Sequence, residues 1–375
     1  MNTPTIEQRP DQELIPHETK RVIIFDTNAY REFTPRKSLV NSRAKVHRLR
    51  QFEQASGVFV LASPTVIWEL IAHLDDANDP AREHCLNSLV VLGEHAVNPA
   101  KSDGGINLFP DADSTVCREL FHALPPNHEQ GIQNLGSLVK YFVKHAPNIT
   151  DSTALKNVHQ IATNVEATER QWLNLMQTVL AHCDPNVAKR FFGNTSDGDV
   201  RKKVRDFFAS DIFTDMWATF MVEIHAKKVG HTISSGKELR DKVKIMLNVF
   251  SVLFHLMSVL LQKIASDTSF NLSNPKKKRW NFVWDSQLAI SIGASHEIAG
   301  VPVFFVTGDG ELIEAAKAAG EPNRRGRGHL RRCFHPQIRG CPKTQGATAA
   351  GDVGHSTGQR GHHSGRSGRF RVLGG

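Results

Sequence analysis

Short apolar runs alternate with helical patterns near both ends of the chain. Three runs rich in Val, Ile and Phe lie at 22–25, 58–62 and 301–307. Continuous apolar runs of this length are typical of strands that are buried on both faces of a parallel sheet. Helical patterns accompany them at 43–55, 65–74, 285–297 and 311–319. This alternation of strands and helices predicts an α/β fold with a central parallel sheet.

The middle of the chain has a different pattern, because strand signals disappear over residues 80–279. Helical periodicity dominates there and predicts helices at 80–95, 114–123, 132–145, 151–181, 197–228 and 237–267. The expected organisation is a polar lead-in followed by a discontinuous α/β domain that is interrupted by a helical insertion. These three parts span 1–20, 21–79 together with 280–320, and 80–279.

Residues 321–375 differ from the rest of the chain in composition and charge. They contain 12 of the 27 glycines, and their 11 Lys and Arg residues against 2 acidic residues give a charge balance of +9. The remaining residues have a balance of −1, so the net charge of +8 is weak evidence for nucleic-acid binding. Too few apolar residues are present to form a core, and we expect this Arg-, Gly- and His-rich tail to be disordered.

The cysteines and the apolar segments bear on the cellular compartment. The five cysteines are scattered and form no CxxC pair, which favours a reducing environment. Residues 1–20 lack the apolar segment of a secretory signal. Polar side chains interrupt the apolar stretch 245–261, which falls short of the roughly 20 apolar residues of a membrane span. The sequence therefore predicts a cytoplasmic protein without a membrane segment.

Four acidic residues stand at strand ends or helix starts in the two α/β segments. Asp26 follows the first strand, Glu69 lies in the second turn of a helix, Asp285 opens a predicted helix, and Asp309 follows the last strand. Because the carboxyl ends of parallel strands meet at one edge of a sheet, we expect these carboxylates to gather there. Clustered carboxylates repel one another, and a hard cation such as Mg²⁺ or Mn²⁺ relieves that repulsion. Such an ion can activate water against a phosphodiester.

The ordered set of motifs resembles the PIN-domain (PIN-like) nuclease family. The matching segments are Asp26-Thr27-Asn28, Val66-Ile67-Trp68-Glu69-Leu70, Asp285-Ser286-Gln287-Leu288-Ala289-Ile290 and Thr307-Gly308-Asp309. The resemblance implies a three-layer α/β/α fold with a central parallel sheet, and a site that binds Mg²⁺ or Mn²⁺ and cleaves nucleic acid, RNA more than DNA. Two features depart from the family: 216 residues separate the second motif from the third, and no strand signal follows residue 320.

The resemblance also assigns roles to individual residues. The metal ligands, which would also be the catalytic residues of an endoribonuclease, are Asp26, Glu69, Asp285 and Asp309. Asp26 and Asp285 would bind the metal directly, and the other two directly or through water. A simpler interpretation exists for each residue, because Asp commonly caps helices and turns and Glu69 could be a solvated helix position.

Other residues are expected to support such a site. Asn28 and Thr307 would orient carboxylates or water by hydrogen bonds. A basic run just before Trp280 would contact phosphates, and it consists of Lys276, Lys277, Lys278 and Arg279. A solvated loop is an equally good interpretation of that run.

Three other functions are alternatives to a nuclease. A haloacid-dehalogenase-like phosphatase also has a strand followed by Asp, but it needs a second carboxylate where this chain has Asn28. A PIN-like module that binds nucleic acid or protein without catalysis is the main alternative. A toxin that is neutralised by an antitoxin is another. The sequence leaves open whether a protein partner exists and whether the chain forms a homo-oligomer.

Overall fold

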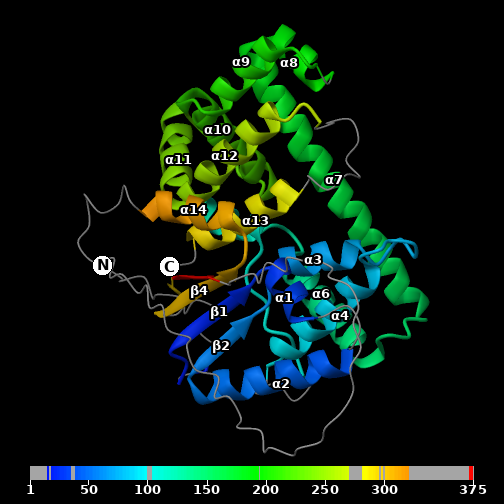
Figure 1. Ribbon diagram of the computed structural model, residues 1–375. Helices are drawn as coiled ribbons and strands as arrows, with labels where there is room; N and C mark the ends of the chain where they lie inside the picture. Colours follow the sequence, from blue (N-terminus) through cyan, green and yellow to red (C-terminus); the bar gives the residue numbers. More distant parts are fainter. Residues whose placement is uncertain are drawn as a thin grey trace, which may run out of the picture.

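Two lobes make up the molecule, an α/β lobe and a helical lobe (Figure 1). The computed structural model describes residues 15–16, 18–34, 39–98, 104–193, 195–269, 281–294, 297–298, 300–320 and 371–374. The long helix α7 (Ser152–Cys183) runs from beside the α/β lobe to the far end of the helical lobe. The predicted α/β class with a large helical part is confirmed.

Three parallel strands form the centre of the sheet in the order β2-β1-β4. They are β1 (Arg21–Phe25), β2 (Val58–Leu61) and β4 (Val301–Thr307). Ile23 of β1 pairs with Val60 of β2 on one side and with Phe304 of β4 on the other. All three predicted strands are confirmed to within one residue at each end, because their continuous apolar runs fit a central position in a sheet.

Two short strands border β4 on the edge away from β1. β3 (Glu297–Ile298) pairs antiparallel with the start of β4, and β5 (Arg371–Gly374) pairs antiparallel with its end. The expectation of a disordered tail is therefore wrong for residues 371–374. A short segment gains its strand structure from the hydrogen bonds that an open sheet edge offers, which no local pattern reveals. The rest of the expected tail lies outside the described residues.

Five helices belong to the two α/β segments of the sequence. They are α1 (Thr27–Phe33), α2 (Leu39–Ala55), α3 (Pro64–Ala72), α13 (Asn281–Ala294) and α14 (Gly310–Gly320). Helix α1 was not predicted, because its short sequence resembles a turn and Asp26 caps it. Helix α13 includes Asn281, four residues before the expected start, so Asp285 lies inside the helix. The expectation that Asp285 opens this helix is therefore wrong.

The expected insertion is helical throughout its described length, apart from connecting loops. With α7, its helices are α4 (Arg82–His95), α5 (Ala112–Phe121), α6 (His128–His145), α8 (Pro185–Phe192), α9 (Gly198–Phe208), α10 (Asp211–Lys228), α11 (Gly236–Val249) and α12 (Ser251–Ser266). Two predicted helices are each divided. The helix expected at 197–228 is interrupted after α9, and Ser210 caps α10. The helix expected at 237–267 bends by 77° between α11 and α12.

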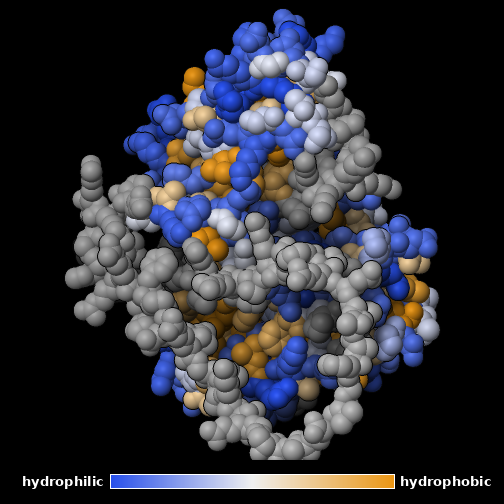
Figure 2. Space-filling model, in the orientation of Figure 1, coloured by the Kyte–Doolittle hydropathy of each residue, from blue (hydrophilic) through white to orange (hydrophobic). Residues whose placement is uncertain are grey.

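One hydrophobic core extends through both lobes. It includes Val22 of β1 and Leu253 of α12, both of which are fully buried. Gly293 lets α13 approach the bend between α11 and α12, since a Cβ atom there would lie 2.9 Å from the carbonyl oxygen of Val249. Figure 2 shows mainly hydrophilic residues over α8 and α9, at the far end of the helical lobe.

None of the described helices has, by itself, the length and apolar composition of a membrane span. Helices α11 and α12 reach that length and composition only when they are taken together as a bent pair.

Candidate active site

Asp26 directly follows β1 and caps α1. Its Oδ1 accepts a hydrogen bond from the Ala29 N–H at 2.5 Å, and its Oδ2 accepts one from the Thr307 hydroxyl. Its own N–H donates to a β4 carbonyl at 3.0 Å, so β4 fixes its position. Asp26 is 3% exposed, and burial raises the pKa of its carboxyl to about 6 against the lowering effect of the two hydrogen bonds. The charges of Glu69 and Asp309 contribute to this rise.

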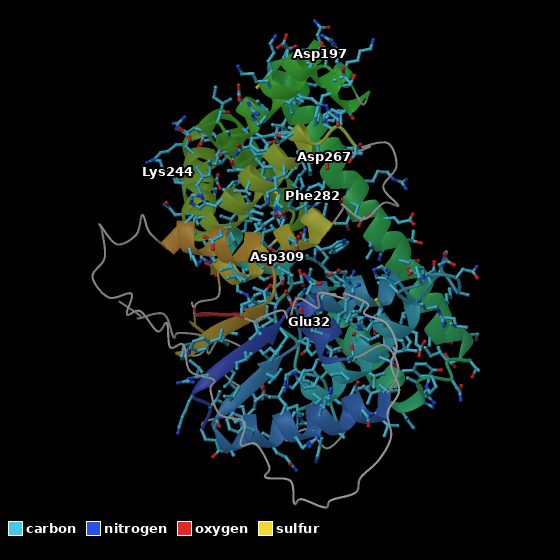
Figure 3. All side chains as sticks on the ribbon, viewed as in Figure 1. Glu32, Asp197, Lys244, Asp267, Phe282 and Asp309 are labelled. Atoms are coloured by element: carbon cyan, nitrogen blue, oxygen red, sulfur yellow. The ribbon has the colours of Figure 1, made fainter. Side chains whose placement is uncertain are left out.

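Thr307 and Asp309 form the turn from β4 into α14. Besides donating to Asp26, the Thr307 hydroxyl accepts a hydrogen bond from the Asp309 N–H at 2.9 Å. Asp309 Oδ1 accepts from the N–H groups of Glu311 at 2.7 Å and Leu312 at 2.9 Å, which caps α14. Figure 3 shows Asp309 between the sheet and the helical lobe. The buried hydroxyl of Thr307 therefore connects two of the predicted acidic residues.

Glu69 lies in the second turn of α3, as predicted, and its side chain meets α1. Its Oε2 accepts a hydrogen bond from the Thr27 hydroxyl at 2.5 Å, and its Oε1 lies 4.0 Å from the Arg31 guanidinium. Thr27 is buried and is the first residue of α1. The residue that follows Asp26 in sequence thus positions Glu69. Thr27 belongs to the quoted motif, but the sequence alone did not assign it this role.

Asp285 approaches the other carboxylates from α13. It is half-buried, and burial raises the pKa of its carboxyl to about 8. The charges of Asp309, Glu69 and Asp26 contribute to this rise, in that order. Among the described residues, no hydrogen-bond donor reaches its side chain. The uncharged form of Asp285 is therefore strongly favoured as long as only acidic groups surround it.

A further acidic residue, Glu169 of α7, belongs to the same neighbourhood. Its Oε1 accepts a hydrogen bond from the Trp284 indole N–H at 2.9 Å. Burial, together with the charges of Glu166 and Glu69, raises the pKa of Glu169 to about 7. Helix α7 packs against α3, which brings Glu169 toward Glu69. Sequence analysis missed Glu169, because it lies in the middle of a long helix where no cap, turn or strand end marks it.

Among the described residues that were predicted to support the site, Asn28 does not join this group. Asn28 is exposed on α1, and no hydrogen bond links its side chain to a described carboxylate, so its expected orienting role has no geometric basis. The predicted phosphate-binding residues lie outside the described residues, and they are Lys276, Lys277, Lys278 and Arg279. The four predicted carboxylates share one neighbourhood, since hydrogen bonds link Asp26 to Thr307 and Thr307 to Asp309, and the charges of Asp309, Glu69 and Asp26 all raise the pKa of Asp285.

The four predicted carboxylates are ligands of the kind that Mg²⁺ and Mn²⁺ prefer. All donors are carboxylate oxygens, which hard divalent cations prefer. Burial and acidic neighbours raise two of the pKa values, so ionisation of these carboxyls is costly, and a bound cation would offset that cost. Each carboxylate oxygen has two lone pairs, and the hydrogen bonds to Asp26, Glu69 and Asp309 leave some of them available. Within the described ranges, no three Asp, Glu, His or Cys side chains are already arranged to hold a metal ion.

A groove of about 900 Å³ is lined in part by α3 and α13, the helices that carry Glu69 and Asp285, although none of the four carboxylates lines it. Trp68 and Trp284 line it, and they directly precede Glu69 and Asp285 in sequence. Much of the remaining lining comes from α6 and α7 and is rich in amide side chains. The amide residues of the lining are Asn134 on α6, Asn157, Gln160, Asn164 and Gln171 on α7, and Gln287 on α13. The residues that precede Glu69 and Asp285 therefore face a groove of aromatic rings and hydrogen-bonding amides, whose lining also includes Asp111, Asp113 and Asp151.

The functional interpretation rests on this geometry and on the sequence motifs. No protein-family model, no curated protein and no solved structure matches the chain.

Proposed function

We propose that the chain is a metal-dependent nuclease with a PIN-like α/β fold, and that it hydrolyses phosphodiester bonds in single-stranded RNA. The convergence of four carboxylates from β1, α3, α13 and the turn after β4 is the observation that supports this most. Their charges act on one another's ionisation. Mutual repulsion of this kind is relieved when a divalent cation binds between the carboxylates.

The proposed cofactor is Mg²⁺ or Mn²⁺, held by Asp26, Glu69, Asp285 and Asp309. When bound, such an ion lowers the pKa of water and offsets the charge of a phosphodiester. Side-chain hydroxyls prepare two of the ligands, since Thr307 holds Asp26 and Thr27 holds Glu69. Burial keeps bulk water away from Asp26, which strengthens its interaction with a cation.

The lining of the groove favours a single-stranded over a double-stranded substrate. Amide groups can donate to and accept from the edges of unpaired bases, and tryptophan rings can stack on their faces. The groove has one lysine in its lining, Lys228, and that side chain pairs with Asp113 at 2.5 Å. The lining is therefore suited to bases more than to phosphates, and a duplex would hide the base edges that it can recognise.

A module that binds nucleic acid without cleaving it is the second candidate. One observation favours it, namely that the described carboxylates do not present three ligands already in place for a metal ion. Such a module would keep the groove and its amides, and it would need no cofactor.

Substituting Asp26 tests the proposal directly. Asp26→Asn keeps a side chain that can cap α1 but removes a charged metal ligand. We expect cleavage of labelled single-stranded RNA in the presence of Mg²⁺ or Mn²⁺ to fall by about 100-fold or more. The measurement is the cleavage rate of RNA and of DNA of the same sequence, for wild type and variant, with each metal and with chelator.

Asp197→Asn provides a matched control. Asp197 also caps a helix, α9, by accepting hydrogen bonds from the N–H groups of Asp199 and Val200. Figure 3 shows it at the far end of the helical lobe, away from Asp309. Cleavage that survives in Asp26→Asn would contradict the proposal. RNA binding by wild type without cleavage and without metal binding would instead establish the non-catalytic module.

A further inference from the structure

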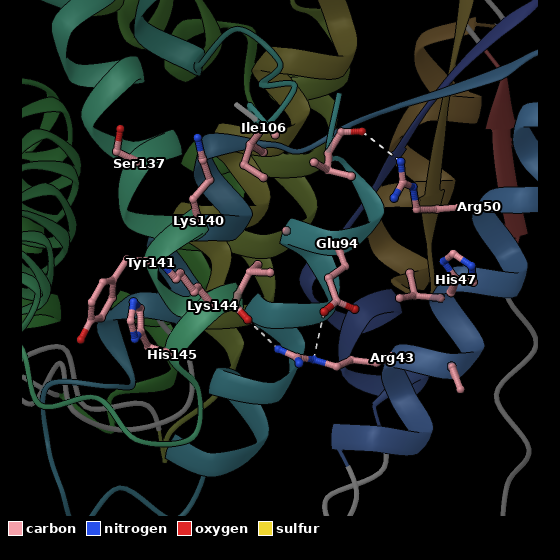
Figure 4. A pocket seen from close by; sticks show the side chains of 16 residues that line it. Arg43, His47, Arg50, Glu94, Ile106, Ser137, Lys140, Tyr141, Lys144 and His145 are labelled. Atoms are coloured by element: carbon pink, nitrogen blue, oxygen red, sulfur yellow. Dashed lines mark hydrogen bonds and ion pairs between the residues drawn. The ribbon is translucent and has the colours of Figure 1, made fainter. Parts of the chain in front are cut away.

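A second cavity, bordered by α2, α4 and α6, is strongly basic (Figure 4). We call it the basic cavity. Its volume is about 850 Å³, which lies within the usual range of small-molecule sites. The cationic and titratable basic side chains in its lining are Arg43, Arg50, Lys140, Lys144, His47 and His145. Against them stands one acidic side chain in the lining, that of Glu94.

Backbone carbonyls hold the two arginines at the wall of the basic cavity. Arg43 donates to the carbonyl oxygen of Val143 at 2.6 Å and pairs with Glu94 at 2.9 Å. Arg50 donates to the carbonyl oxygen of Val97 at 3.2 Å. Figure 4 shows these contacts as dashed lines. A guanidinium has five N–H donors, so each arginine is held in place and still has donors for a ligand.

The rest of the lining provides apolar and aromatic surface. Val46, Val97 and Ile106 are among its apolar residues. At the rim, the rings of Tyr141 and His145 stack with centroids 4.6 Å apart and planes at 24°. A ligand that fills the basic cavity would therefore combine negative charge with a flat, weakly polar part.

We propose that the basic cavity binds a nucleoside phosphate. Its phosphates would contact Arg43, Arg50 and Lys144, since arginine and lysine are the usual donors to phosphate oxygens. Its base would lie against the apolar wall or the Tyr141 ring, where stacking is favourable. Four Lys and Arg side chains line the basic cavity against one Glu, and this positive charge favours a ligand with more than one negative charge. No residue of the carboxylate group lines the basic cavity, so this inference does not depend on the nuclease proposal.

Calorimetric titration of the full chain in chelator tests the inference. The probes are ATP, AMP, inorganic pyrophosphate and inorganic phosphate. ATP is expected to bind most tightly, because it provides both several charges and a base. Lys144→Gln removes one cationic side chain at an exposed position and should weaken ATP binding about tenfold or more. Lys45→Gln is the matched control, because Lys45 is exposed on α2 and does not line the basic cavity.

Each other outcome would overturn a stated part of the inference. Absence of ATP binding, or an equal loss in Lys45→Gln, would overturn the site itself. Pyrophosphate that binds as tightly as ATP would overturn the assignment of a nucleoside. ATP binding that is lost in Asp26→Asn would place the nucleotide at the carboxylate group. A single-stranded oligonucleotide without terminal phosphates that displaces ATP at lower concentration would show a strand-binding surface.

Discussion

Individual carboxylates in the candidate active site differ in how much the fold itself needs them. Asp26 and Asp309 cap helices, and Glu69 accepts a hydrogen bond from Thr27, so these three have structural partners. Asp285 has acidic neighbours and no hydrogen-bond donor among the described residues. Ionisation of Asp285 therefore opposes folding as long as no cation is present, whereas the other three carboxylates also support local structure.

This difference predicts how stability depends on pH. The carboxyls of Asp26, Glu169 and Asp285 have pKa values of about 6, 7 and 8 in the folded protein. In the unfolded chain such groups ionise near pH 4, so above that pH the folded state binds more protons than the unfolded state. We therefore expect the Tm of the metal-free protein to fall as pH rises from 5 to 8.5, as measured by thermal denaturation in chelator. A Tm that stays constant over this range would contradict the prediction.

A substitution of Asp285 should separate the effect of its charge on Tm from the effects of the other titrating groups. Asp285→Asn removes a repelled charge at nearly constant volume, so the metal-free variant should have a higher Tm than wild type at pH 8 and a weaker pH dependence. Mg²⁺ should raise the Tm of wild type at pH 8 through preferential binding to the folded state, and it should raise that of the variant much less. Equal stabilisation of both proteins by Mg²⁺ would argue against Asp285 as a ligand.

At the scale of elements, helix α4 packs closely against α6 at a glycine, Gly93. A Cβ atom at Gly93 of α4 would lie 2.5 Å from Val143 and 2.8 Å from Val139, both on α6. Gly93→Ala should lower the free energy of unfolding by about 1–3 kcal/mol, the usual cost of overpacking. Urea denaturation measures this change.

Gly131→Ala on α6 is the control, since no atom outside its own turn of helix lies within 4 Å of the place that a Cβ would take there. Alanine favours a helix over glycine by roughly 1 kcal/mol, so this variant should be as stable as wild type or more stable. Equal destabilisation of both variants would show that the contact between α4 and α6 is not the cause.

Local patterns explain which elements could be predicted from the sequence. The three parallel strands could be predicted, because each apolar run and its flanking turn residues lie next to one another in the chain. The interruption between α9 and α10 at Ser210 could not be predicted, since the apolar pattern continues across it. Asp26, Glu69 and Asp309 could be recognised as site candidates from their places at strand ends or early in a helix. Glu169 could not, because only the packing of α7 against α3 brings it near Glu69.

At the scale of the whole molecule, the shared core predicts cooperative unfolding. Apolar residues of β1 and α12 belong to one buried cluster, although they lie in different lobes. We expect scanning calorimetry of the metal-free chain to show one transition, whose calorimetric and van't Hoff enthalpies agree. Two resolved transitions would show that the helical lobe and the α/β lobe unfold separately.

The hydrogen bond between Thr307 and Asp26 joins residues that are 281 positions apart in the chain. Bringing such distant segments together costs loop-closure entropy before the contact contributes any stability, and folds with many distant contacts form slowly. Strand β1, which directly precedes Asp26, is synthesised long before β4, its partner in the sheet. During that interval the carboxylate group does not exist, so the newly made chain has no complete acidic site until the intervening helices have been synthesised.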